Sequence, residues 1–72
     1  MKYSIYQGLI TSGGNGDYYE VYSCNNKAEL RKIFNSIKRD KKCWNWRPGS
    51  YLQTYLVNNL TDEIIVEHRE DY

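Results

Sequence analysis

One short stretch of this chain carries the repeat of an amphipathic α-helix, and strand-like sequence flanks it on both sides. Its apolar residues fall at i, i+3, i+4 and i+7 and are Leu30, Ile33, Phe34 and Ile37. We expect this helix to span residues 26–42, with Asn26 as its N-cap and Glu29 in the capping-box position. Because 72 residues make one small domain, the helix must cover the apolar side of whatever the strands form.

The rest of the chain has the alternation of β-strands separated by turn-forming residues. We expect strands at residues 2–11, 17–24, 50–58 and 63–69. The predicted fold class is therefore α+β, a single domain over residues 1–72. In it, a four-stranded antiparallel sheet carries one helix packed on one face, in the order β-β-α-β-β. The pattern leaves the order of the strands within the sheet open.

Alternation also predicts which side chains face the helix. We expect Tyr19 and Val21 on the helix side in the second strand, and Ile64 and Val66 in the fourth. Gly8 interrupts the first strand and indicates either a bulge or a close approach of another backbone segment. Several tyrosines then share the opposite face and form a candidate interface for a second copy of the chain or for another molecule. They are Tyr6, Tyr18, Tyr22, Tyr51 and Tyr55.

Basic residues gather on one flank of the expected helix. At about 100° per residue, this flank carries Lys27, Arg31, Asn35, Lys38 and Lys42. Lys32 and Arg39 extend the basic side outward. Two interpretations stay open: a solvated face whose late cations complement the helix dipole, or a surface that contacts phosphates or an acidic partner.

Two tryptophans follow the helix and make the most suggestive constellation in the chain. In extended backbone, Trp44 and Trp46 lie on the same side, and Pro48 favours such a conformation for Arg47. Indole rings stack on bases, arginine binds phosphate, and an amide offers both a donor and an acceptor. The alternative is that both indoles cap the open end of the core. The candidate ligand-binding residues are Arg31, Lys38, Arg39, Lys41, Lys42, Trp44, Asn45, Trp46 and Arg47.

Composition narrows the classes of function. The net charge of +1 gives no overall field toward nucleic acid or membrane. No apolar run approaches the roughly 20 residues of a membrane span, and the N-terminus lacks a signal sequence, so we expect a cytoplasmic protein. Cys24 and Cys43 are too few for a zinc site, and His68 is the only histidine. We therefore expect no metal, no cofactor and no catalytic activity.

The layout from the 2–11 strand to the 63–69 strand, with paired hairpins around one helix, resembles small phage-encoded anti-defence proteins, among them anti-CRISPR proteins. The resemblance lies in size and element order and carries no motif, so no functional residue transfers. It implies a stoichiometric inhibitor or sequestering protein in the host-cell cytoplasm. Such a protein binds a nucleotide, a nucleic acid or a host nucleoprotein complex of the defence system. The near-neutral charge argues against a DNA mimic.

Two other classes of function stay open. The first is a protein–protein interaction module that acts through the tyrosine-rich face, as a homodimer or as an inhibitor of a host protein. The second is a minimal nuclease or hydrolase.

Overall fold

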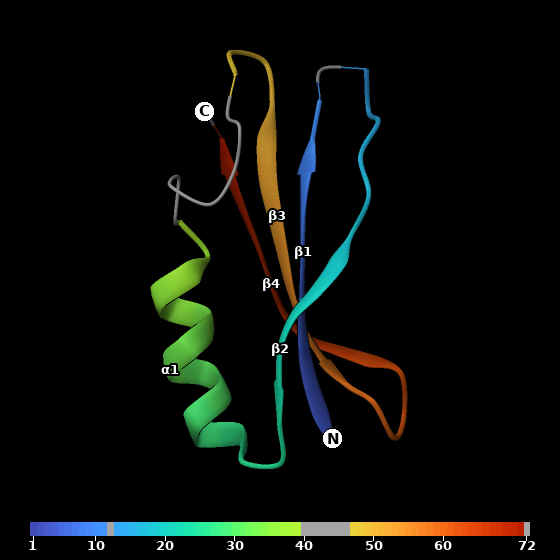
Figure 1. The fold of residues 1–72 in the computed structure, drawn as a ribbon, viewed down its shortest axis with the longest axis vertical. Coiled ribbons are helices and arrows are strands. Elements are labelled where there is room, and N and C mark those ends of the chain that lie inside the picture. The colour runs from blue at the N-terminus through green and yellow to red at the C-terminus, as the bar shows by residue number, and fades with distance from the viewer. Residues whose placement is uncertain (12, 40–46, 72) are drawn as a thin grey trace.

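The computed structural model describes residues 1–11, 13–39 and 47–71, which form four strands and one helix (Figure 1). The elements are β1 (Tyr3–Ile10), β2 (Tyr19–Cys24), α1 (Lys27–Ile37), β3 (Tyr51–Asn58) and β4 (Glu63–Asp71). The strands make one antiparallel sheet in the order β2-β1-β3-β4. With α1 on one face of this sheet, the predicted α+β fold and its β-β-α-β-β order are confirmed.

The helix begins where the sequence indicated. The Asn26 side-chain oxygen accepts hydrogen bonds from the backbone N–H of Ala28 at 2.9 Å and of Glu29 at 3.3 Å. These bonds satisfy donors that lack partners inside the helix. The Glu29 carboxylate has a different role from the one predicted, because it accepts a hydrogen bond from the Tyr22 hydroxyl at 2.9 Å. It therefore links the first turn of α1 to β2.

The helix ends at Ile37, earlier than the predicted bound at residue 42, and residues 40–42 lie outside the described residues. The amide of Gln7 in β1 contributes to this end. Its Nε2 donates to the carbonyl oxygen of Ile37 at 3.0 Å and to Oγ1 of Thr54 at 3.1 Å. Gln7 and Thr54 are both buried. A polar side chain of a central strand thus supplies a donor to a carbonyl in the last turn of the helix.

The core lies between α1 and the two central strands. Leu30 and Phe34 are buried against Ile5 of β1 and Leu56 of β3. Burial of each such side chain contributes roughly 1.5–3 kcal/mol. The predicted apolar stripe is confirmed, since the two remaining members also pack on this cluster and are half-buried. They are Ile33 and Ile37.

The helix covers only part of the sheet. Its backbone lies close to β1, β2 and β3 but not to β4. The connection explains this placement, because only residues 25 and 26 separate β2 from α1, so the helix must begin beside that outer strand. β4 forms the opposite edge of the sheet. The helix therefore does not lie over β4, and the residues of β4 on that face lie to one side of α1.

A β-bulge in β2 changes which of its side chains face the helix. Tyr22 lies opposite Ile5 and Glu20 lies opposite Tyr6, which leaves Val21 as an extra residue. An extra residue reverses the alternation of side chains beyond it. The two parts of β2 therefore follow different alternations.

The predicted faces of β2 were wrong for this reason. Tyr22 and Cys24 pack against the core on the helix side, although Tyr22 was expected on the opposite face. Tyr19 and Val21 were expected to face the helix, but they are 58% and 42% exposed. The periodicity of an isolated strand contains no sign of where its partner will skip a residue.

A second bulge lies in β4. Leu56 pairs with Val66 and Val57 pairs with Ile64, so Ile65 is the extra residue. Ile65 and Val66 both pack against the core, whereas Ile64 is 51% exposed. The inward placement predicted for Val66 is confirmed, and that predicted for Ile64 was wrong.

Gly8 marks the close approach of backbone that the sequence indicated. A Cβ atom at this position would lie 2.6 Å from the Asp17 carbonyl oxygen and 2.9 Å from Cδ1 of Tyr18. Only a residue without a side chain leaves room for the segment that enters β2. Among the described residues, no helix is long and apolar enough to span a membrane.

Candidate functional site

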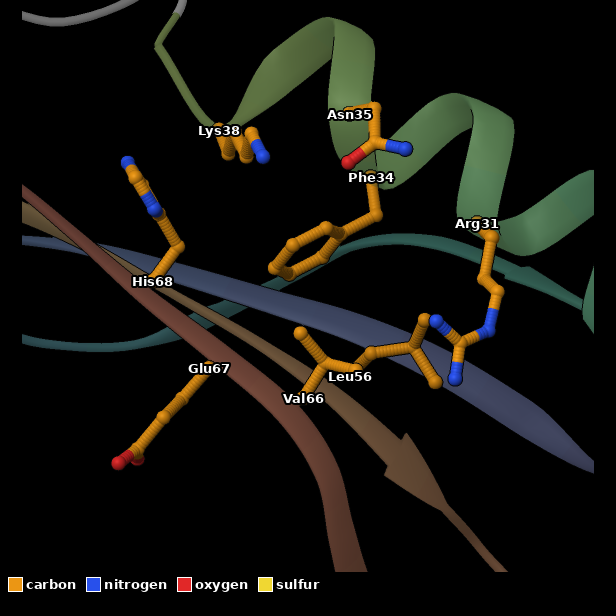
Figure 2. A pocket seen from close by; sticks show the side chains of 8 residues that line it. All are labelled: Arg31, Phe34, Asn35, Lys38, Leu56, Val66, Glu67 and His68. Carbon is orange, nitrogen blue, oxygen red and sulfur yellow. The ribbon is translucent and has the colours of Figure 1, made fainter.

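A groove lies where the helix stops short of β4 (Figure 2). Its volume is about 110 Å³. The residues that line it come from α1 and its C-cap, from β3 and from β4. They are Arg31, Phe34, Asn35, Lys38, Leu56, Val66, Glu67 and His68.

The floor of the groove is apolar and belongs to the core. Phe34 and Leu56 are buried, and Val66 is packed against the same cluster. Because these side chains also hold the helix on the sheet, the floor is fixed by the fold itself. Little of this floor is exposed, because Leu56 is fully buried and Phe34 is 3% exposed.

The helix supplies a polar and basic rim. Arg31, Asn35 and Lys38 are spaced i, i+4 and i+7, so they share one flank of α1 as predicted. Lys38 is half-buried, with its Nζ 5.8 Å from the centre of the Phe34 ring, a cation–π distance. Arg31 reaches from the helix toward the sheet (Figure 2). Within the described part of the chain, Arg31 and Lys38 form no ion pair.

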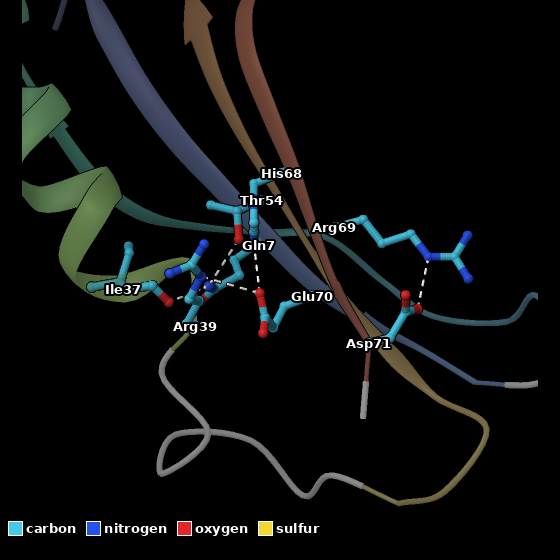
Figure 3. Close-up of polar contacts among 8 residues, drawn as sticks. All are labelled: Gln7, Ile37, Arg39, Thr54, His68, Arg69, Glu70 and Asp71. Atoms are coloured by element: carbon cyan, nitrogen blue, oxygen red, sulfur yellow. Dashed lines mark hydrogen bonds and ion pairs between the residues drawn. The ribbon is translucent and has the colours of Figure 1, made fainter.

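Polar contacts lie near the C-terminal end of the helix, around His68 of the groove lining (Figure 3). Oε1 of Glu70 lies 2.8 Å from Nε2 of His68 and 3.3 Å from Nε of Arg39. These contacts join β4 to the residues that follow α1. The negative charge of Glu70 is thereby engaged at one end and is not presented to the cations of the rim.

The one carboxylate among the described lining residues does not face the groove. The side chain of Glu67 points away from the helix in Figure 2. The register agrees, because Glu67 is opposite Tyr55, on the other face of the sheet. Among the described residues that line the groove, no carboxylate therefore faces Arg31 or Lys38, and the groove suits an anion.

The other predicted ligand-binding residues have different outcomes. Arg39 pairs with Glu70 beside the groove. Arg47 is exposed, and its backbone N–H donates a hydrogen bond to Oγ of Ser50 at 3.2 Å. The rest lie outside the described residues, so their role stays a prediction. They are Lys41, Lys42, Trp44, Asn45 and Trp46.

Sequence reasoning missed the contribution of β4 to this site. His68 follows Val66 by two residues, and alternation places both on the helix side. That signal was available in the sequence. The sequence does not indicate that His68 lies near Arg31 and Lys38, because that proximity depends on the strand order.

The tyrosine-rich face lies on the other side of the sheet. Tyr6 pairs with Tyr55, and the ring of Tyr18 is 5.3 Å from that of Tyr55, centre to centre. Tyr51 shares this face, since it lies four pairs from Tyr55 along the same ladder and an even number of residues keeps the face. Tyr22 does not, because the bulge turns it toward the helix. The predicted interface is thus reduced to four of its five tyrosines.

Within residues 1–11, 13–39 and 47–71, no group of three or more His, Cys, Asp or Glu side chains is arranged to hold a metal ion. No protein-family model, no curated protein and no solved structure matches this chain.

Proposed function

We propose that this chain is a non-catalytic binding protein that holds a phosphate-bearing ligand, a nucleotide or a segment of nucleic acid, in the groove between α1 and β4. One observation carries the proposal. Arg31 and Lys38 stand over an apolar floor, and neither has a carboxylate partner among the described residues. A ligand with a negative charge therefore finds two cations at the rim of a groove whose base is closed by apolar side chains.

The two cations have complementary uses. The guanidinium of Arg31 can bind two phosphate oxygens with parallel N–H donors, whereas the Lys38 ammonium acts as a point charge. The apolar floor excludes water from one side of the contact, and charge-assisted hydrogen bonds strengthen as the local dielectric falls. Asn35 lies between them on the helix and offers a donor and an acceptor to a base edge.

The size of the groove limits how much of a ligand it encloses. Its volume of about 110 Å³ is small beside the roughly 300–1,000 Å³ of pockets that enclose a drug-sized molecule. One phosphate or one ring therefore enters the groove, and the rest of the ligand lies across the rim. Trp44 and Trp46 are predicted to extend the site by stacking on bases.

In a cell, such a protein acts by binding its target one to one, without turnover. It sequesters a nucleotide, or it covers the nucleic-acid site of a host nucleoprotein complex. The resemblance to small phage-encoded anti-defence proteins supports this mode of action and a host-cell cytoplasmic location.

A titration with two probes, ATP and a short single-stranded oligonucleotide, tests the proposal by calorimetry and by amide NMR shifts. The informative variant is Arg31→Gln with Lys38→Gln. The matched control is Lys27→Gln with Lys32→Gln, which removes the same charge from exposed positions of the same helix that do not line the groove.

The groove variant is expected to bind about tenfold or more weakly, a loss of roughly 1.4 kcal/mol. The control is expected to lose only the part of the affinity that comes from non-specific attraction between positive charge and phosphate. That part weakens as the salt concentration rises. Equal losses in the two double variants would show that charge alone, not the groove, attracts the probe. Thermal melts of both variants verify that the fold is intact.

The same titration tests the tryptophans separately. Quenching of indole fluorescence by either probe is expected from stacking at Trp44 and Trp46. If the groove amides shift while indole fluorescence stays constant, the tryptophans are not part of the site.

A further inference from the structure

The face of the sheet opposite α1 carries a repeated pairing of a tyrosine on a central strand with a carboxylate on the adjacent outer strand. The registered pairs are Tyr6 with Glu20, Tyr55 with Glu67, and Tyr51 with Asp71. Because Tyr6 also lies opposite Tyr55, one row across the four strands reads carboxylate, tyrosine, tyrosine, carboxylate. Cross-strand partners share a face, so each carboxylate flanks a ring.

One of the three pairs already binds a guanidinium from the chain itself. Cζ of Arg69 lies 3.8 Å from the centre of the Tyr51 ring, and its Nε lies 2.9 Å from Oδ1 of Asp71 (Figure 3). The ring takes the flat face of the guanidinium, and the carboxylate takes an N–H on its edge. This contact shows that a tyrosine–carboxylate pair on this sheet has the spacing that an arginine needs.

The other two pairs have the same chemistry, and neither has a basic partner among residues 1–11, 13–39 and 47–71. Arg69 is the only Lys or Arg within the four strands. The Glu67 side chain is exposed and forms no hydrogen bond or ion pair within the described residues. Glu20 is engaged only by hydroxyl donors, those of Ser4 at 3.2 Å and Tyr6 at 3.4 Å, both to Oε2. Its negative charge is therefore not neutralised.

The charge of this face selects the kind of partner. The strands place three carboxylates on it, Glu20, Glu67 and Asp71, against one guanidinium, Arg69. A phosphate backbone is repelled there, whereas a cationic segment is attracted. We propose that this face docks an arginine-bearing extended segment of a partner protein, with guanidinium groups stacked on Tyr6 and Tyr55 and paired with Glu20 and Glu67.

The geometry sets the spacing of those arginines. Tyr6 and Tyr55 lie on adjacent strands, which are about 4.8 Å apart. Alternate residues of an extended segment point to the same side and lie about 6–7 Å apart, so arginines at positions i and i+2 match the two rings. The ring of Tyr18 packs against that of Tyr55 and restricts its orientation.

Two synthetic peptides test the docking site: a seven-residue Gly/Ser peptide with arginines at alternate positions, and the same peptide with lysines. Calorimetry at low salt is expected to show that the arginine peptide binds about fivefold or more tightly than the lysine peptide. The lysine ammonium cannot stack on a ring as a planar guanidinium does, and it cannot donate two parallel hydrogen bonds to one carboxylate. Amide NMR shifts are expected at Tyr6 and Tyr55.

Glu67→Gln removes one carboxylate from the row and is expected to weaken the arginine peptide about fivefold, as loss of an exposed charge pair allows. Its matched control is Glu63→Gln, at the other end of β4 and opposite Asn58. The groove variant Arg31→Gln with Lys38→Gln is expected to retain peptide binding, so this test stands or falls independently of the phosphate-binding proposal.

Three outcomes would overturn the docking proposal. Equal affinity for the arginine and lysine peptides would show simple charge attraction. Equal losses from Glu67→Gln and Glu63→Gln would place the contact elsewhere. Light scattering that shows a dimer, dissociated by Glu67→Gln, would make a second copy of the chain the occupant of this face.

Discussion

The side-chain amide of Gln7, in a central strand, donates to the backbone carbonyl of Ile37, the last residue of the helix, at 3.0 Å. The same nitrogen also donates to Oγ1 of Thr54 at 3.1 Å. Two elements that are distant in sequence are thus joined to the helix terminus through one buried group. The contact fixes the C-terminal end of α1 to the two central strands.

Replacement of Gln7 by leucine should therefore destabilise the protein. Leucine has a similar size but lacks the N–H donor. The Ile37 carbonyl and Oγ1 of Thr54 then lose a hydrogen-bond partner, which costs roughly 1–3 kcal/mol in the interior. Urea denaturation measures the change in the free energy of unfolding. Gln53→Leu, in β3 on the opposite face of the sheet, is the control and should change it by less than about 0.5 kcal/mol. Similar losses in both variants would contradict this role for Gln7.

The N-cap of the helix provides a second test. Asn26→Ala removes the acceptor for two backbone N–H groups, and the expected loss is about 1 kcal/mol of stability. Asn26→Asp retains a capping oxygen and should recover most of that loss. If alanine and aspartate at this position give the same stability, the cap does not stabilise α1.

Gly8 should not tolerate even one added carbon. In Gly8→Ala the new methyl group would lie 2.6 Å from the Asp17 carbonyl oxygen, so the segment entering β2 must move. We expect a loss of roughly 1–3 kcal/mol, as for other overpacked sites. Gly13→Ala is the control, because its nearest neighbour would be an Asn15 side-chain atom at 3.3 Å. Equal stability of the two variants would show that the hairpin adjusts without strain.

The raised pKa of Tyr18 predicts that the free energy of unfolding falls at alkaline pH. Burial, followed by hydrogen bonding and charge interaction with Tyr55, raises the pKa of Tyr18 from 10.0 to about 12. The folded state then holds this proton more tightly than the unfolded state, so the contribution is complete below pH 10 and is lost as the pH rises toward 12. Denaturation of Tyr18→Phe should show a smaller decline over this interval than the parent protein does. Tyr19→Phe is the matched control, and equal declines in the two variants would refute the assignment.

The fold was predictable from sequence wherever a local pattern dictates the outcome. The spacing of Leu30 and Phe34 identified the buried face of the helix, and Asn26 identified its start. Strand positions and turns followed from alternation and glycine. The helix terminus was less predictable, since the donor for Ile37 comes from Gln7, thirty residues earlier in the chain.

Bulges account for the errors in side-chain orientation. Nothing in the residues around Tyr22 indicates that β1 skips Val21, because a bulge is a property of a pair of strands. The adjacent Ile64 and Ile65 were a clearer signal, since two consecutive isoleucines break the alternation of β4. A bulge there explains both residues, with Ile65 on the core side and Ile64 exposed.

The candidate groove was half predictable. The helical period identified the flank with Arg31, Asn35 and Lys38. The opposite wall requires the strand order, which places β4 at the edge that the helix does not cover. The proposed contribution of Trp44 and Trp46 stays a prediction, because both lie outside the described residues.

Both outer strands of the sheet contain one unmatched residue, Val21 in β2 and Ile65 in β4. A bulge bends and twists a strand and interrupts the regular spacing of its outward donors and acceptors. Amyloid fibrils grow by adding chains to long, flat, regular edges. The irregular edges of this sheet therefore disfavour the addition of further chains to either outer strand.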